Sequence, residues 1–402
     1  MKSTAVAAES RFVSWALAAL FWFVPLWAIF AALDPERPGL PLIAPRNAVL
    51  VFGVVALVDF AIVAIVGLRA KQPRAVRIAF LSGGVVAIVT GLCGFDPVTG
   101  VAFGIGAAGV ELGGLAISAA GPQTTRLCLR AFLWSSLCAC LAALVMLGAR
   151  HPAALYEYDN ARAVGTFLNP NELAAYTVVA LGGAVPLAIY ARDRLASVTA
   201  IVLAATLAAT FSRWGIVSAA CGVAAFALAT RSRSLLGATI GIALAGFALN
   251  AALGARHHNP VDLEMRGAAW SVGIATFERF PLTGVGALAF GRTYDAMRTP
   301  DAPGSQHPIA FDPHSIPISV AASGGIVSLV TLLASTIFLQ RRVYFAAARA
   351  PGASRFVAIG LASGLIGLYV DCLPNTIVIF FPLMYQTTAL ALALSRNAAV
   401  AE

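Results

Sequence analysis

Residues 195–230 read LASVTAIVLAATLAATFSRWGIVSAACGVAAFALAT, and Arg213 is the one charged side chain among them. A helix needs about 20 mainly apolar residues to cross the hydrocarbon core of a bilayer. The stretch is long enough for two short spans that are separated by Ser212 and Arg213. It therefore predicts two membrane helices that meet in a tight turn.

The composition of the whole chain agrees with a membrane protein. Of its 402 residues, 59% are hydrophobic and 11% are Asp, Glu, Lys or Arg, and the mean hydropathy is +0.85. Soluble globular proteins carry about 25% charged residues, and disordered chains combine high charge with few apolar residues. Both classes are excluded, and residues 1–402 are expected to form one integral membrane domain without a soluble tail domain.

Apolar runs of spanning length recur along the chain and predict an all-α polytopic protein with about twelve transmembrane helices. The first run is too long and too rich in Trp for a cleaved signal peptide. The expected spans are 12–33, 47–68, 76–94, 98–120, 127–149, 171–190, 195–211, 214–230, 235–254, 316–339, 355–371 and 374–394.

Basic residues in short loops indicate how the chain is oriented. The loop that carries Arg69, Lys71, Arg74 and Arg77 is strongly basic, and such loops lie in the cytoplasm. Strict alternation then places both termini in the cytoplasm and the other short basic loops on the same side. The net charge of +9 is thus a topology signal, and we expect no nucleic-acid partner.

Cysteine and histidine patterns do not point to a metal site. The six cysteines lie in or beside expected spans, with spacings that match neither a zinc site nor a secreted disulfide framework. His257, His258 and His307 all fall on the outer side but lack a supporting carboxylate–histidine spacing. We therefore expect no metal and no other cofactor.

The segment 255–315 is the one sizeable loop outside the membrane, and it is expected on the periplasmic side. An amphipathic helix is predicted over 262–280, with Asp262 placed to cap it and Pro281 to stop it. The glycines of TGVGALAFG, 283–291, would let backbone approach a ligand. The expected apolar stripe of the helix contains Leu263, Ala269, Trp270, Gly273, Ile274 and Phe277.

A few polar residues stand out against the apolar background. Arg213 is a functional candidate because a charge at membrane depth is costly, although an interfacial arginine that reaches the lipid headgroups is the alternative. Asp59 and Glu111 are intramembrane charges whose structural and functional roles both stay open. His314 is placed as a general base or as an ordinary interfacial side chain. Asp371 and Asn375, on either side of Pro374, are expected to cap an outer turn.

Several short motifs occur in an order that resembles the O-antigen ligase superfamily, which includes O-antigen ligases, O-antigen polymerases and protein O-oligosaccharyltransferases. The resemblance covers roughly 160–330, and the first five spans carry no motif. The motifs are GTFLNPNELAAY at 165–176, TFSRWG at 210–215, MRGAAW at 265–270, FPLTGVG at 280–286, PHS at 313–315 and SGGIVS at 323–328.

The resemblance implies an inverting, metal-independent membrane glycosyltransferase of the bacterial inner membrane, with an active site that faces the periplasm. The donor is a glycan on undecaprenyl diphosphate, and the acceptor of a ligase is a sugar of the lipid A-core. The family pattern assigns catalytic roles to Arg213, Arg266 and His314. Many members have Asn after the histidine, where this chain has Ser315. A further motif with a less certain role in donor binding matches Arg162, Asn169 and Asn171.

These residue types suit the implied chemistry. Arginine offers a planar, always-charged fork for phosphate oxygens, so Arg213 and Arg266 would hold the diphosphate and stabilise its developing charge in place of a metal. His314 would accept the proton of the attacking hydroxyl. A polymerase that extends the lipid-linked glycan uses the same donor chemistry and remains the main alternative.

Two other functions are less favoured. The protein-directed oligosaccharyltransferases are often larger and carry a soluble C-terminal part that this sequence lacks. Twelve spans and the charges of Asp59 and Glu111 also suit a transporter. However, the two halves show no repeat, and the polar residues gather on one side rather than at the midplane.

Overall fold

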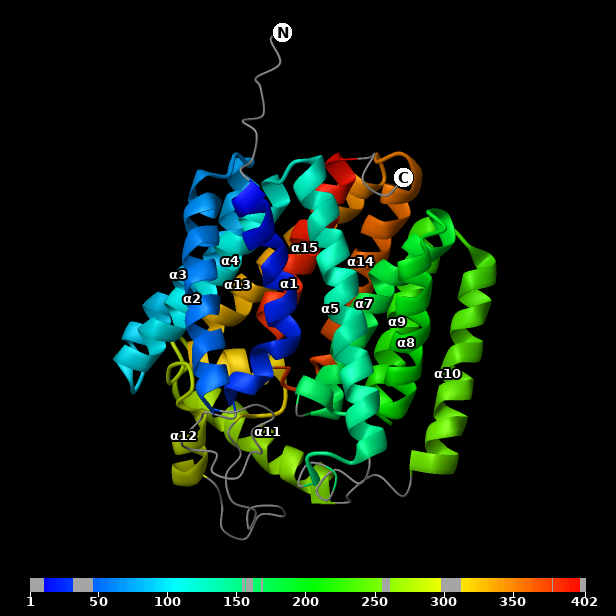
Figure 1. Ribbon diagram of the computed structural model, residues 1–402. Helices are drawn as coiled ribbons and strands as arrows, with labels where there is room; N and C mark the ends of the chain where they lie inside the picture. The colour runs from blue at the N-terminus through cyan, green and yellow to red at the C-terminus, as the bar shows by residue number, and fades with distance from the viewer. Residues whose placement is uncertain are drawn as a thin grey trace.

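A computed structural model describes residues 11–31, 46–153, 156, 162–167, 169–254, 261–297, 312–377 and 379–397 of the chain. Within these ranges the protein is helical throughout and contains no strand. His257, His258 and His307 lie outside the described residues. The helices stand side by side as a bundle, with α11 and α12 lying across one end (Figure 1). The first turn of α1 and the last turn of α15 lie at the opposite end.

Each of the twelve expected spans overlaps a helix. Seven of these helices, α3, α4, α5, α7, α9, α13 and α14, are long and apolar enough to cross a membrane; the count of twelve spans and their orientation stay predictions. The elements are α1 (Arg11–Ala31), α2 (Arg46–Arg69), α3 (Arg74–Leu92), α4 (Pro97–Ala119), α5 (Pro122–Ala149), η1 (Gly165–Phe167), α7 (Pro170–Tyr190), α8 (Arg194–Ala209), α9 (Arg213–Thr230), α10 (Arg233–Gly254), α11 (Val261–Arg279), α12 (Phe290–Met297), α13 (Ile316–Ala347), α14 (Gly352–Asp371) and α15 (Phe380–Arg396).

The outer faces of several helices are apolar and uncovered. Val54, Leu57 and Val58 on α2 are between 55% and 72% exposed, although a soluble monomer rarely leaves a contiguous patch of this kind open. In the interior, α7 and α14 pack so closely that a Cβ on Gly360 would meet the carbonyl oxygen of Gly182. Small residues at helix contacts and large apolar ones outside are the pattern expected in lipid.

A break inside α13 is the feature that orders the α11 end of the bundle. Gly325 has φ +64° and ψ −166°, which is outside the helical region. The neighbouring backbone groups turn to the loop after α11: Val285 N donates to Ala322 O over 3.0 Å, Gly286 N to Ser323 O over 2.9 Å, and Ile326 N to Pro281 O over 2.8 Å. The TGVG motif at 283–286 and the SGG motif at 323–325 are therefore joined by backbone hydrogen bonds, an arrangement that we call the interlock.

This interlock corrects one expectation from the sequence. The glycine-rich segment after α11 was expected to leave its backbone open to a ligand, but in the described part its first half is bonded to the protein. Val285 also accepts a hydrogen bond from Phe95 N, 2.8 Å away in the turn between α3 and α4. The loop consequently joins α11, α13 and the α3–α4 turn.

The helix predicted at 262–280 is present as α11, but two details of the prediction were wrong. Asp262 lies inside the first turn, since the helix begins at Val261. The buried stripe contains Ala269, Val272, Gly273 and Thr276, whereas Ile274 is 49% exposed. The stripe is rotated because the small Gly273 face packs against Pro313 and Ile318. Pro281 does follow the helix end, as expected.

The last span was also predicted too early. It was expected to begin at residue 374, but α15 begins at Phe380. Residues 374–377 instead form the non-helical link between α14 and α15. Their polar backbone groups are used by the candidate site that is described below.

We expect Gly325→Ala to lower the stability of the folded protein by about 1–3 kcal/mol, because a non-glycine residue in this conformation is strained. A Cβ there would also meet the carbonyl of Leu282. The check is thermal unfolding of the purified protein in detergent.

Gly106→Ala on α4 is the matched control, since a Cβ at Gly106 has no heavy atom within 4 Å. An equal loss of stability in both variants would show that the α13 break does not depend on the glycine.

Candidate functional site

Arg266 connects α11 with the link between α14 and α15. Its Nη1 donates to the carbonyl oxygen of Pro374 over 2.8 Å and to Oδ1 of Asn375 over 3.0 Å. Asn375 is in turn fixed by its Nδ2, which donates to Oδ1 of Asp371 over 2.8 Å and to the Asp371 carbonyl over 3.2 Å. The expected capping by Asp371 and Asn375 is thus present, and it also orients the arginine.

His314 stands at the entrance of α13 in an unusual backbone conformation. Its φ is +51°, a region that non-glycine residues seldom adopt. Asp312 stabilises the turn, because its Oδ1 accepts a hydrogen bond from His314 N over 2.6 Å. The same oxygen lies 3.8 Å from the imidazole Nδ1, and the His314 side chain is 42% exposed. A carboxylate beside one ring nitrogen leaves the other to face solvent or a ligand.

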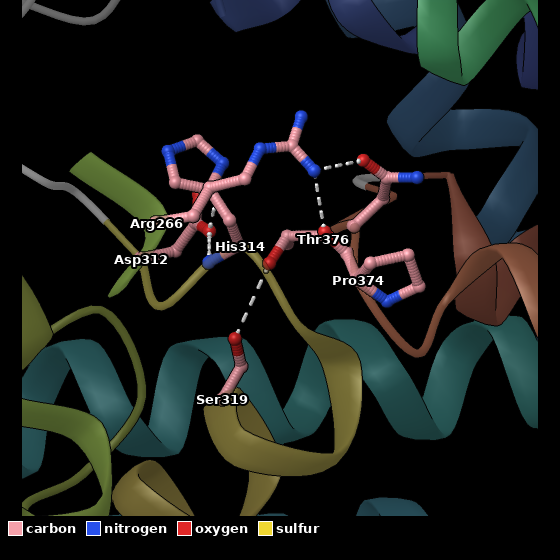
Figure 2. Close-up of polar contacts among 7 residues, drawn as sticks. Arg266, Asp312, His314, Ser319, Pro374 and Thr376 are labelled. Carbon is pink, nitrogen blue, oxygen red and sulfur yellow. Dashed lines mark hydrogen bonds and ion pairs between the residues drawn. The ribbon is translucent and has the colours of Figure 1, made fainter. Parts of the chain in front are cut away.

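Several contacts bring the segments of Arg266 and His314 together. Ile316 N donates to the carbonyl of Cys372 over 3.0 Å, and the hydroxyls of Ser319 and Thr376 are 3.4 Å apart. Figure 2 shows Arg266 and the His314 ring beside the Pro374–Thr376 link, with Ser319 below it. Two of the three predicted catalytic residues are therefore neighbours around one link.

Arg213 is presented differently. It is the first residue of α9, after the N-cap Ser212, whose Oγ accepts a hydrogen bond from Gly215 N over 3.1 Å. The Arg213 side chain is exposed and has no hydrogen-bond or ion-pair partner among the described residues. A helix N-terminus already favours anions through its dipole and its unpaired N–H groups, so the arginine adds a full charge to a suitable place.

The residues predicted to bind the donor hold the turn before Arg213. Arg162 is buried; its Nε donates to the carbonyl of Thr210 over 2.8 Å and its Nη2 to Oδ1 of Asn171 over 3.3 Å. The Ser212 hydroxyl donates to the same Asn171 oxygen over 3.0 Å. Asn169 caps α7, because its Oδ1 accepts from Asn171 N over 2.8 Å. Through these contacts Arg162, Asn169 and Asn171 stabilise the turn that precedes Arg213 and the adjacent start of α7.

Cys372, which directly follows α14, is buried near acidic side chains of both groups. Burial raises the pKa of the Cys372 thiol, and the carboxylates of Asp371 and Glu172 act in the same direction. Glu172 follows Asn171 on α7, whereas Asp371 is bonded to the Asn375 that holds Arg266. No described polar contact joins Arg213 to Arg266 or His314.

An apolar cavity of about 300 Å³ opens beside His314. Asp312, Pro313 and Thr376 line it next to the histidine, and Glu111 and Tyr385 line it deep between the helices. Glu111 is almost fully buried, and both of its carboxylate oxygens accept from Gly84 N at 2.9 Å. Asp59, the other intramembrane acid, is not among the lining residues described.

Sequence reasoning missed two residues of this site. Asp312 lies two positions before His314, and an Asp that bonds the backbone N–H two residues later is a known turn signal, so the DPH sequence could have indicated it. The contacts of Asn375 with an arginine 109 positions earlier leave no local pattern. Asn375 was expected to cap a turn, but its contact with Arg266 was not foreseen.

Comparison with known protein families supports the resemblance found in the motifs. The model of the family described as O-antigen ligase matches residues 198–333. This segment is therefore similar to the O-antigen ligase domain and supports the superfamily that the motifs resemble. It includes Arg213, Arg266 and His314, together with both halves of the interlock at the α13 break. A search of curated proteins finds no match to the chain.

We expect Ser212→Ala to destabilise the protein by about 1 kcal/mol, because α9 loses its N-cap and Asn171 loses a donor. Intrinsic fluorescence during thermal unfolding is a suitable measurement, because Trp214 lies two residues away.

Ser197→Ala is the control, since the Ser197 hydroxyl donates back to the carbonyl of Asp193, the N-cap of α8, and is dispensable to the helix. Equal effects of the two substitutions would contradict a special role for the Ser212 cap.

Proposed function

We propose that this protein is an O-antigen ligase, which transfers a glycan from undecaprenyl diphosphate to a sugar of the lipid A-core on the periplasmic side of the inner membrane. The main support is the position of Arg266 and His314, which are held around the Pro374–Thr376 link, beside an apolar cavity that is lined by Asp312, Pro313 and Thr376. The family match supports glycosyl transfer in general terms, and the ligase reaction is the proposal.

The arginines would act on the leaving group. As the bond between the sugar C1 and the diphosphate oxygen breaks, negative charge develops on the diphosphate. Arg266 approaches from α11 with a guanidinium already oriented by Asn375 and the Pro374 carbonyl. The exposed Arg213 at the N-terminus of α9 would supply a second charge. Preorganised charges of this kind stabilise a transition state without a metal ion.

His314 would act on the acceptor. Its Nε2 takes the proton of the attacking hydroxyl while the new bond forms between that oxygen and C1, and undecaprenyl diphosphate leaves from the opposite face. Asp312, 3.8 Å from Nδ1, stabilises the imidazolium that forms, in the way a carboxylate supports a catalytic histidine elsewhere. Inversion at C1 follows from attack opposite the leaving group.

We expect His314→Gln, Arg213→Ala and Arg266→Ala each to reduce glycan transfer on the order of 100-fold or more. Arg266→Lys should recover part of the activity, because it keeps the charge and loses the fork. The measurement is transfer of a lipid-linked glycan by the purified protein.

Arg292→Ala is the matched control, since Arg292 is exposed on α12 at the same end of the bundle. Wild-type transfer should also persist in EDTA. Normal transfer by the His314 and Arg266 variants, or a complete EDTA loss that one divalent metal reverses, contradicts this mechanism.

A glycolipid profile of a deletion strain separates the ligase from the polymerase alternative. We expect long glycans to accumulate on undecaprenyl diphosphate while the lipid A-core stays bare, because the donor is complete and only its attachment fails. Accumulation of single repeat units on the lipid carrier would instead identify a polymerase.

A further inference from the structure

A groove lies along α3 at the end of the bundle opposite α11. The orientation of α3 is fixed by the hydrogen bond from Phe95 N, just after its C-terminal end, to Val285 O, so its first residue, Arg74, lies at the other end (Figure 1). The groove has a volume of about 710 Å³. It is lined by Gln72, Arg74, Arg77, Ile78, Leu81, Ser82, Val85 and Val86.

The groove has a charged mouth and an apolar length. Arg74 and Arg77 line its first turn, both exposed, and Ile78 and Val85 further along are each 57% exposed. From Arg74 to Val86 the helix rises about 18 Å, which is close to the roughly 15 Å hydrocarbon depth of one leaflet. The groove is therefore long enough to hold one acyl chain in one leaflet.

The charge at the mouth is not compensated by the protein. Neither the Arg74 nor the Arg77 side chain has a hydrogen-bond or ion-pair partner among the described residues. The nearby Gln72 is occupied: its Nε2 donates to the carbonyl and hydroxyl of Ser118 over 2.7 and 3.0 Å. A third cation, Arg396, also donates to the Ser118 carbonyl. Arg396 therefore lies near Gln72, and the described lining of the groove contains two guanidinium groups and no carboxylate.

We propose that this groove is a binding site for an anionic glycerophospholipid of the leaflet at this end of the bundle. The phosphate would bind between Arg74 and Arg77, and one acyl chain would lie along Leu81 and Val85. Basic pockets at membrane surfaces recognise anionic headgroups in this way, and the apolar length of the groove selects a lipid over a free phosphate. The proposal is independent of the glycosyl transfer proposed above.

The site bears on the rest of the molecule through α3. Val86 lines both this groove and the apolar cavity beside His314. A bound lipid would therefore support, from the membrane side, the helix that walls the cavity. At this position the lipid would stabilise the packing of α3 in addition to solvating the protein.

The test measures lipid retention by the purified full-length protein. Native mass spectrometry counts bound phosphatidylglycerol after exchange into detergent, with phosphatidylcholine and soluble glycerol phosphate as comparison ligands. We expect retention of phosphatidylglycerol alone, and a loss on the order of tenfold or more in the double variant Arg74→Gln, Arg77→Gln.

The matched control is the double variant Arg69→Gln, Lys71→Gln, which removes the same charge from the end of α2 and the loop after it without touching the groove lining. A second variant, Val85→Trp, fills the groove and changes no charge, so it should also reduce retention. Equal loss in both charge variants, equal retention of phosphatidylcholine, or full retention by Val85→Trp would each overturn the site. Thermal unfolding of each variant shows whether it is folded.

Discussion

Backbone polar groups inside a membrane must find partners within the protein, and this requirement organises the α11 end of the structure. In hydrocarbon an unsatisfied N–H or carbonyl costs several kcal/mol. The break at Gly325 frees the carbonyls of Ala322 and Ser323 and the N–H of Ile326, and the loop from Pro281 to Gly286 satisfies all three. The loop thereby fixes the start of α13, which His314 directly precedes, against α11, which carries Arg266.

The three arginines of the candidate site differ in how far the protein already uses them. Arg162 is buried and bonded to the α8–α9 turn, so its charge stabilises the scaffold. One nitrogen of Arg266, Nη1, donates to two acceptors, and these two hydrogen bonds orient the guanidinium. Arg213 is exposed and without a described partner. A graded arrangement of this kind suits a site in which one cation is positioned in advance and another meets the ligand.

The sequence predicts the helices well because each must present about 20 apolar residues to lipid, and this requirement is local. It predicts their ends less well where tertiary contacts decide them. Residues 374–377 were included in the last span because an apolar run follows them, but the Pro374 carbonyl and the Asn375 side-chain oxygen bind Arg266 instead. The stripe of α11 was displaced for a similar reason: the partner of Gly273 is Pro313, which lies 40 positions away. The motifs indicated His314 and Arg266, whereas their arrangement around one link depends on contacts that no local spacing encodes.

The position of Glu111 shows how an acidic side chain can be accommodated deep in such a bundle. A carboxylate in hydrocarbon is unstable unless it is hydrogen-bonded, and here both oxygens accept from one backbone N–H in α3. A Cβ on the neighbouring Gly83 would collide with the same carboxylate, so α3 presents two small residues where Glu111 needs room. Because α4 contributes the acid and α3 the donor, the contact holds together two walls of the cavity beside His314.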